Sequence, residues 1–576
     1  MSERSDSRLA VTLPPLVAGA ARFAGVGPAD RARLARACAL TVAAVAAEWA
    51  ETAAAVKWPA GAGNGAGRPP AVGAEELATG PLTTLRLLLL TAAALEDVAR
   101  DGLPRLARPP RLEHAGAGGA TRVAVDVLPV GWLHDAAIWR GHRATVRCVD
   151  QGGLEGFARG WRQEASERPR AGGVAAVLGA GNVTGLAAAD CVSQIFEHGR
   201  AAVVKLHPLH APLEGVLRRA LAPLVDAGLA EFITGDAATS RALVAAAGVT
   251  HVHLTGGRGA FDAVVWDGRD PRAAGVRPAL AKPITCELGN VTPWIVVPGH
   301  YTPAQLAFQA DAVAASIVNN TSFNCIATKL VVTCRSWPQR DAFLAAVGRR
   351  LASEPARPGW YPGAAAAWTA VTGGRLPDDG TLPWVFRTGL DLRQHPEWAD
   401  REWFVPVAAE TAIEAADIEA FCVRAAGVAH ALPGSLAASV TVPSGLAAWE
   451  RDRVENLIGH LEYGVVAVNG WSAVAYAVGN VPWGGFPGAT LAEPASGIGR
   501  VHDPLLLPLV HNAILRSPLA EWPAPPWFPW HRRTTPLTRG LVGLYADLAR
   551  GRRGLVPLVR MLPAVFLSLL DPPRRP

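Results

Sequence analysis

Residues 173–205 read GVAAVLGAGNVTGLAAADCVSQIFEHGRAAVVK, and this stretch decides the fold. An apolar run that ends in glycine is typical of a buried strand, the apolar segment after it indicates a helix, and AAVVK at 201–205 indicates a second strand. Strands that alternate with helices predict a parallel, doubly wound sheet, and nucleotides bind at the Gly-rich strand ends of such sheets. The alternation continues with a helix over 211–228, a strand over 231–235, a helix over 236–248 and a strand over 249–257.

Two reactive side chains follow this stretch. Glu287 lies in KPITCELGNVTPWIVV, residues 282–297, and Cys325 lies in SIVNNTSFNCIATKLVV, residues 316–332. A thiolate can attack a carbonyl carbon, and a carboxylate of tuned pKa can activate the water that clears the resulting thioester. A second alternating block, from 293 to about 468, predicts a further α/β domain.

The motifs around these residues resemble those of the aldehyde dehydrogenase superfamily, in the same chain order. ELGNVTP at 287–293 is similar to the family's E-L-G-G-K-x-P, and NTSFNC at 320–325 is similar to its N-x-G-Q-x-C. The resemblance covers roughly residues 120 to 515, which is far more than one motif. Further similar runs are ERPRAGGVAAVLGAGNVTG (167–185), VVKLHP (203–208), HLTGG (253–257), EWFVPV (402–407), VAVNG (466–470), PWGGF (482–486) and SGIGR (496–500).

The resemblance implies a fold, an activity and a set of site residues. The expected fold is aldehyde-dehydrogenase-like, and the expected reaction is oxidation of an aldehyde to a carboxylic acid through a cysteine thioester, with hydride transfer to NAD or NADP. Cys325 is then the nucleophile, Glu287 the general base, and Asn182 the residue that holds the oxyanion. The cofactor-binding residues that it implies are Lys205, His207, Gly256, Gly257, Glu402 and Phe404.

Each catalytic residue also has an ordinary structural role open to it. Cys325 could be a buried thiol, Glu287 could be an exposed strand charge, and Asn182 could cap the helix that follows it. Among the cofactor-binding residues, Glu402 could lie in a solvated acidic turn. Cys286 precedes Glu287 in a predicted strand, so the two side chains should point to opposite faces, and we expect Cys286 in the core.

The loop after Lys205 bears on the choice of cofactor. It reads Lys205-Leu206-His207-Pro208-Leu209-His210, without the acid that repels a 2′-phosphate in NAD-preferring relatives. His207 or His210 could even contact such a phosphate. The sequence therefore predicts that NADP is accepted alongside NAD.

Two other classes of function stay open. Acyl-CoA or fatty-acid reductases of the same superfamily run the thioester chemistry in reverse, and a degenerate homologue would bind nucleotide without turnover. Retention of Cys325, Glu287 and Asn182 together favours a working oxidase. His251 and His253 share a strand face, but they lack a third ligand nearby, so no metal site is predicted.

Composition agrees with a globular enzyme. The 576 residues are 50% hydrophobic and 18% charged, and the net charge of +6 comes mainly from arginines spread along the chain. This spread does not indicate a nucleic-acid surface. The seven cysteines include no C-x-x-C pair, which favours a reducing, cytoplasmic compartment, and the N-terminus does not read as a signal peptide.

Helical patterns over 28–57 and 75–101 open the chain. A small-molecule aldehyde substrate and a homo-oligomer are the expected partners. The predicted parts are an N-terminal helical part of the cofactor domain (1–121), a small β oligomerisation arm (122–150), a dinucleotide-binding domain (151–286), a catalytic domain (287–468), a return segment that completes the core (469–520), and a Pro/Trp linker with an amphipathic C-terminal extension (521–576).

The C-terminal extension lies outside the family resemblance. WPAPPWFPW at 522–530 cannot be helical. After it, Leu537, Leu541, Leu544 and Leu548 follow a helical stripe, and the apolar run over 555–570 is too short to span a bilayer. Two alternatives are open: the extension binds a membrane surface as a peripheral anchor, or it packs on the protein itself.

Overall fold

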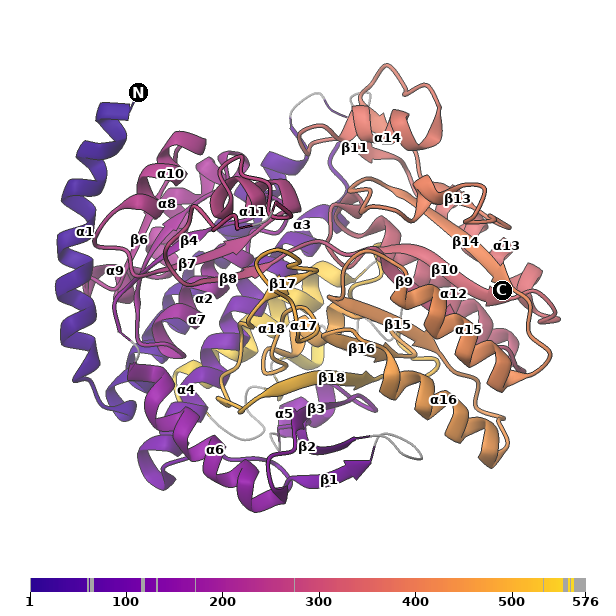
Figure 1. Cartoon of the computed structure of the whole chain (residues 1–576), viewed down its shortest axis with the longest axis horizontal. Coiled ribbons are helices and arrows are strands. Elements are labelled where there is room, and N and C mark those ends of the chain that lie inside the picture. Colours follow the sequence, from indigo (N-terminus) through magenta and orange to yellow (C-terminus); the bar gives the residue numbers. More distant parts are fainter. Residues whose placement is uncertain are drawn as a thin grey trace.

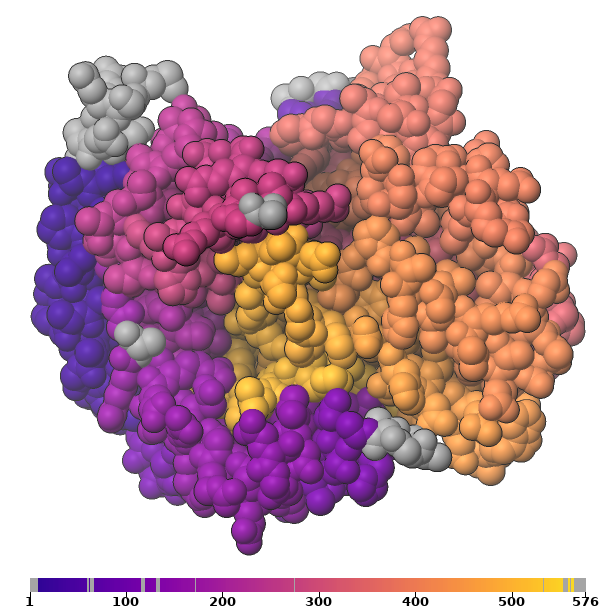
Figure 2. Space-filling view, in the orientation of Figure 1, coloured from indigo at the N-terminus to yellow at the C-terminus, as the bar shows by residue number. Residues whose placement is uncertain are grey.

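The computed structural model describes residues 2–59, 62, 67–114, 120–130, 133–170, 172–273, 275–531, 533–552, 558–559 and 561–563. In Figure 1 a dinucleotide-type lobe lies on the left, a second α/β lobe on the right and the arm below. Figure 2 shows the segment near residue 490 between the two lobes. The predicted α/β class with a doubly wound parallel sheet is confirmed.

The first sheet is the parallel sheet predicted from residues 173–205. Its strand order is β17-β8-β7-β4-β5-β6, and the neighbours from β8 to β6 are all parallel. The inner strands are buried along their whole length, as expected when helices cover both faces. The strands are β4 (Val174–Leu178), β5 (Ala201–Lys205), β6 (Ala230–Ile233), β7 (His251–Thr255), β8 (Ile284–Glu287) and β17 (Gly497–Ile498), and the helices are α7 (Leu186–Phe196), α8 (Glu214–Ala220), α9 (Ala222–Asp226), α10 (Ala237–Ala245) and α11 (Arg258–Val265).

The helix predicted over 211–228 is interrupted. It is divided into the 3-10 turn η3 (Pro208–Leu213), α8 and α9. Pro223 lies in the first turn of α9, where a proline is tolerated, whereas in the interior of one long helix it would remove a hydrogen bond and clash with the preceding turn.

The N-terminal helices pack beside this sheet. α2 (Pro28–Lys57) has the predicted bounds, and the helix predicted over 75–101 ends a longer run of α3 (Pro70–Leu77), η1 (Ala78–Leu82) and α4 (Thr83–Asp101). By length and composition alone, α2 and the run Pro70–Asp101 could cross a membrane. In the structure α2 packs on α4, α3 and α8. The sequence did not predict α1 (Ser2–Ala24), which packs on α10 and β5.

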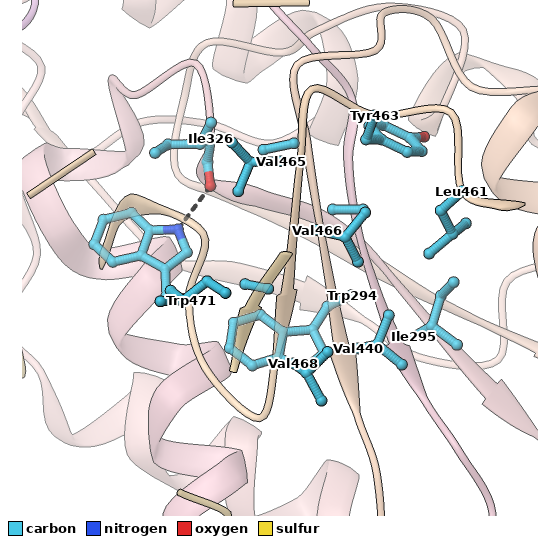
Figure 3. Packing of buried hydrophobic residues seen from close by; sticks show 14 of the residues in the cluster. Trp294, Ile295, Ile326, Val440, Leu461, Tyr463, Val465, Val466, Val468 and Trp471 are labelled. Atoms are coloured by element: carbon cyan, nitrogen blue, oxygen red, sulfur yellow. Dashed lines mark hydrogen bonds between the residues drawn. The ribbon is translucent and has the colours of Figure 1, made fainter. Parts of the chain in front are cut away.

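The second sheet has ten strands in the order β1-β2-β3-β18-β16-β15-β9-β10-β14-β13. Its interior is an apolar cluster in which Trp294, Val440 and Val466 pack together (Figure 3). The strands are β9 (Thr292–Val296), β10 (Thr328–Cys334), β13 (Val385–Arg387), β14 (Val407–Ile413), β15 (Ala437–Thr441), β16 (Val465–Val468) and β18 (Val510–Arg516). Around them lie α12 (Pro303–Val318), η4 (Asn319–Ser322), α13 (Arg340–Ser353), β11 (Arg357–Pro358), α14 (Ala364–Thr372), β12 (Thr381–Leu382), η5 (Pro396–Trp398), α15 (Ile418–His430), α16 (Ala448–His460) and α17 (Ala473–Val478).

The predicted arm forms extended strands, as expected. β2 (Thr121–Leu128) pairs with β1 (Arg111–His114) and β3 (Arg143–Val149), and β3 pairs with β18. The arm therefore continues the second sheet within the same chain, and its role in oligomerisation stays a prediction. α5 (Leu133–Ile138), α6 (Gly153–Glu167) and η2 (Arg168–Arg170) complete this part.

The C-terminal extension packs on the protein over its described part. The linker 522–530 contains no helix, and its Trp527 and Phe528 rings contact Trp471 and Phe308. α18 (Thr534–Ala549) then packs on α2, α3 and α4. Of the two alternatives for the extension, packing on the protein itself is therefore the one that holds for α18. Most of the run over 555–570 lies outside the described residues, so membrane contact there stays a prediction.

Candidate active site

The predicted nucleophile lies on a strained loop that begins in η4 and leads into β10. The three residues Asn320, Thr321 and Ser322 have φ values of 53°, 55° and 63°, in the left-handed region. This conformation costs non-glycine residues about 1–2 kcal/mol each, and it is least common for a β-branched threonine. On the far side of Cys325, the Trp471 indole N–H donates to the Ile326 carbonyl at 2.8 Å (Figure 3). The loop is thus held at both ends.

Cys325 and Glu287 are in direct contact. Cys325 Sγ donates a hydrogen bond to Glu287 Oε1 at 3.2 Å. Glu287 is the last residue of β8 and is 3% exposed, which excludes an exposed strand charge. Cys286 is buried in the core of the dinucleotide lobe, as predicted. The cysteine and the carboxylate that the sequence singled out are thus brought together, and the thiol holds the proton between them.

Burial controls the electrostatics of this pair. Burial raises the pKa of the Cys325 thiol well above its ordinary value, and the carboxylates of Glu287 and Glu402 raise it further. Burial likewise raises the pKa of Glu287, with a further contribution from Asp190. A base whose pKa lies above that of an ordinary carboxylate is better suited to accept a proton near neutral pH.

Asn182 lies against the same loop. Its Nδ2 donates to the Phe323 carbonyl at 3.2 Å, while the helix that follows, α7, begins at Gly185 without a side-chain cap. The alternative role of Asn182 as a helix cap is therefore wrong. The amide has a second N–H, and the backbone N–H of Cys325 lies close to its own Sγ. These are two donors of the kind that an oxyanion requires.

Lys205 is the last residue of β5 and lies at the edge of the first sheet formed by the carboxyl ends of its parallel strands. It is 7% exposed, and burial lowers the pKa of its ammonium group while Asp236 opposes that shift. Among the described residues, no carboxylate lies within ion-pair distance of Lys205. A buried ammonium group without such a partner fits a place against a ligand's hydroxyl or phosphate oxygens.

His207 and His210 have different environments. The His207 ring accepts a hydrogen bond from the Leu209 N–H, stacks on Tyr361 and lies so close to Gly181 that a Cβ there would be 2.3 Å from Nδ1. His210 is 1% exposed, and burial lowers the pKa of its imidazole to about 3. The expectation that His210 could contact a phosphate is wrong, because a buried neutral ring cannot reach one.

The glycine pair Gly256–Gly257 leads from β7 into α11. Gly256 N–H donates to the Glu287 carbonyl at 3.0 Å, so the turn after β7 is bonded to the end of β8. Gly257 is the N-cap of α11, and a Cβ there would meet nothing within 4 Å. A free helix N-terminus with open space beside it suits a pyrophosphate.

Glu402 and Phe404 lie beside the reactive pair. Glu402 packs against Gly289, and its charge interacts with that of Lys329. Burial raises the pKa of the Glu402 carboxyl group and lowers that of the Lys329 ammonium group. The solvated-turn alternative for Glu402 is therefore wrong. Phe404 packs on Phe323 of the nucleophile loop, with ring centroids 5.9 Å apart.

The two histidines of β7 have structural partners. His251 and His253 both reach the Thr285 hydroxyl, and His253 lies 3.4 Å from Asp190. In the described part of the chain, no three His, Cys, Asp or Glu side chains are grouped to hold a metal ion.

A buried ionic cluster under the nucleophile loop was missed from the sequence. It consists of Lys57, Glu75, Glu76 and Arg357. The scarcity of lysine is a sequence signal that could have located this cluster. Only four of the 55 basic residues are lysines, namely Lys57, Lys205, Lys282 and Lys329. Three of the four are buried around this site.

No protein-family model and no curated protein matches the chain. Among solved structures, an NAD-dependent aldehyde dehydrogenase from Sinorhizobium meliloti is similar over 91% of this chain and 88% of its own, with a TM-score of 0.58 and 16% identity. An aldehyde dehydrogenase from Mycobacterium tuberculosis in complex with NAD+ gives 0.58 over 87% and 88%, also at 16% identity. An NADP-dependent glyceraldehyde-3-phosphate dehydrogenase from Bacillus halodurans, complexed with NADP, gives 0.57 over 89% and 91%, again at 16% identity. The chain has the fold of the aldehyde dehydrogenases.

Proposed function

We propose that the protein oxidises an aldehyde to a carboxylic acid with NAD or NADP, through a thioester on Cys325. The observation that carries this proposal is the 3.2 Å hydrogen bond from Cys325 Sγ to Glu287 Oε1, next to the Asn182 amide. The solved structures with this fold support it, since those named above are aldehyde dehydrogenases with NAD or NADP.

The reaction begins when Glu287 takes the thiol proton of Cys325. The sulfur then forms a bond to the aldehyde carbon, and the carbonyl oxygen becomes an oxyanion that the Asn182 amide and the Cys325 backbone N–H stabilise. Removing one such donor costs about 3–4 kcal/mol of transition-state stabilisation. NAD or NADP, when bound, supplies the hydride acceptor that turns this adduct into a thioester.

Hydrolysis completes the cycle. Glu287 first releases the thiol proton to solvent and then takes a proton from water. The hydroxide adds to the thioester carbon, the carbon–sulfur bond breaks to release the acid, and the Cys325 thiolate takes the proton back from Glu287. The residues that would hold the cofactor are Lys205 at the end of β5 and Gly257 at the start of α11, with Glu402 and Phe404 beside the reactive pair. Glu287 in contact with the thiol favours hydrolysis over the reverse, acyl-CoA-reducing direction.

An assay with a panel of short, long and aromatic aldehydes tests this proposal, with NAD and NADP supplied separately and reduced cofactor measured by absorbance. Wild type should form reduced cofactor and acid in equal amounts. Cys325→Ala should form neither, and the matched control Cys286→Ala, which changes the neighbouring buried cysteine, should keep activity. No oxidation of any aldehyde, with reduction of an acyl-CoA instead, would replace the proposal by the reductase alternative.

A further inference from the structure

A buried ion pair lies directly beneath the nucleophile loop. Lys57, the last residue of α2, donates from Nζ to Glu76 Oε1 at 2.5 Å and to Asn320 Oδ1 at 2.8 Å. The side chains of Lys57 and Glu76 are 4% and 2% exposed. A buried pair of this kind seldom adds stability over an apolar pair of the same volume. A role in orienting Asn320 therefore explains it better than stability does.

Lys57 determines which end of the Asn320 carboxamide faces α2. An ammonium group only donates hydrogen bonds, so it selects the amide oxygen and turns the amide nitrogen to the opposite side. There Asn320 Nδ2 donates to the carbonyl oxygens of Asn182 at 3.0 Å and Phe323 at 2.8 Å. If the amide turned over, its oxygen would face two carbonyl oxygens, and the loop would lose both hydrogen bonds.

Glu75, the neighbour of Glu76, holds the backbone of the same residue. Its Oε2 accepts from the Asn320 N–H at 3.2 Å, and its carboxylate accepts two hydrogen bonds from Arg357, each of 2.9 Å. Arg357 leads into Trp360, whose ring packs on Phe323 at 4.9 Å. The Lys57 ammonium lies 5.1 Å from that Trp360 ring. Side chains from α2 and α3 thus contact the loop on several sides.

The choice of lysine at position 57 supports a specific role. Only four lysines occur among the 55 basic residues, so arginine is the default cation of this chain. Lysine is a compact point charge with three donors, whereas the planar guanidinium of arginine needs more space and a different arrangement of acceptors. The space between Glu76 and Asn320 holds a single small cation, which is what the compact ammonium group of a lysine provides.

We propose that Lys57, paired with Glu76, is a positioning residue for the nucleophile. It fixes the Asn320 amide, which in turn fixes Asn182 and the Phe323 carbonyl, and so it sets the place of the oxyanion donors and of Cys325. For its kinetic readout the proposal rests on the function proposed above, but the reactivity of the thiol tests it independently.

The test uses two changes in the full-length protein that remove the interaction without leaving a buried charge or a strained backbone. Lys57→Met with Glu76→Gln removes both charges at once. Asn320→Gly removes the carboxamide and suits the left-handed φ of 53°. In each, kcat for aldehyde oxidation should fall about 10- to 100-fold, because small misplacements of reacting groups have effects of this size, while KM changes little. Combining all three changes should give no further loss.

The second measurement is the pH profile of alkylation of Cys325 by iodoacetamide, followed on its peptide by mass spectrometry. In both variants the released loop moves the thiol away from the Glu287 carboxylate, whose charge raises the pKa of Cys325. The midpoint of the alkylation profile should therefore move to lower pH. Arg36→Met with Glu96→Gln is the matched control, because it removes another ion pair of α2 that is remote in sequence from the loop, and it should leave both readouts unchanged.

The outcomes separate the two proposals. Wild-type kcat and a wild-type alkylation profile in Asn320→Gly would overturn the role of Lys57, whether or not the Lys57 variant folds. If wild type oxidises no aldehyde, the proposed function fails, and the alkylation profile alone decides the positioning role: a shift supports it, and no shift overturns it.

Discussion

Glu287 Oε1 and Cys325 Sγ lie 3.2 Å apart, although Glu287 belongs to one sheet and Cys325 to the loop that leads into the other. Glu287 ends β8 of the dinucleotide-type sheet, and Cys325 precedes β10 of the ten-stranded sheet. The contact therefore exists only where the two lobes meet. The antiparallel pairing of β17 with β8, at Gly497 and Glu287, brings the C-terminal part of the chain to the same place.

Glu287→Gln should separate the two halves of the reaction. Glutamine cannot take a proton from water, so the thioester should hydrolyse slowly. The thioester should still form, because loss of the Glu287 charge lowers the pKa of Cys325 and the thiol can then lose its proton to solvent. We expect a burst of about one reduced cofactor per active site, followed by a steady rate about 10²–10⁴-fold below that of wild type, the usual contribution of a general base. Stopped-flow absorbance checks this, with acyl-enzyme detected by mass spectrometry. An unchanged steady rate would show that Glu287 is not the hydrolytic base.

The pH dependence of the thiol follows from its surroundings. Burial and the carboxylate of Glu287 both raise the pKa of Cys325 well above the ordinary thiol value of 9.0, so in ligand-free protein its alkylation should be slow at pH 7 and should rise only above pH 9. Glu287→Gln removes one negative charge but not the burial. Its profile should shift to lower pH, and a shift to higher pH would contradict this account.

The parallel sheet, the bounds of α2 and the pairing of Cys325 with Glu287 could all be predicted, because each depends on local pattern or on a resemblance in motif order. The Lys57–Asn320 contact could not, because 263 positions separate the two residues and Lys57 lies in no motif. The left-handed backbone conformation of Asn320, Thr321 and Ser322 could not be predicted either. Nothing in those residue types favours three such conformations in a row, and distant side chains impose them.

His210 should make the protein less stable in mild acid. Burial lowers the pKa of its imidazole to about 3, below the ordinary value of 6.5, so the unfolded chain binds a proton that the folded protein refuses. The contribution of neutral His210 to the free energy of unfolding is fully present above pH 6.5 and is lost as pH falls toward 3. At pH 5 the loss from this group is about 2 kcal/mol. Urea unfolding of His210→Asn at pH 7 and pH 5 should show a smaller loss than wild type. The exposed His395→Asn is the control, and an equal loss in all three proteins would contradict the assignment.

Tyr545 should connect the C-terminal helix to the rest of the protein. Arg86 Nη1 donates to its hydroxyl at 3.0 Å and also binds Asp135, and Arg86 is buried. Tyr545→Phe removes an acceptor from a buried cation, so we expect a loss of about 1.5–3 kcal/mol in the free energy of unfolding. Thermal unfolding measures it, and Arg539→Ala on the exposed side of α18 should have no effect. Equal unfolding midpoints for Tyr545→Phe and wild type would show that this contact is dispensable.

Asp236 should tune the choice between NAD and NADP. It follows β6, whose Ile233 lies beside Lys205 of β5, and its charge acts on the Lys205 ammonium. One of its oxygens caps α10 through the Thr239 N–H at 3.0 Å, so the carboxylate is fixed at the edge of the sheet where we propose that the cofactor binds. A 2′-phosphate bound at Lys205 would meet this negative charge, and like charges in contact weaken binding. Asp236→Asn keeps the cap and removes the charge, so the affinity for NADP relative to NAD should rise, by up to about tenfold. Titrations of both cofactors by intrinsic fluorescence measure the ratio. Asp226→Asn, at the end of α9, is the matched control, and a ratio unchanged from wild type in Asp236→Asn would remove Asp236 from cofactor selection.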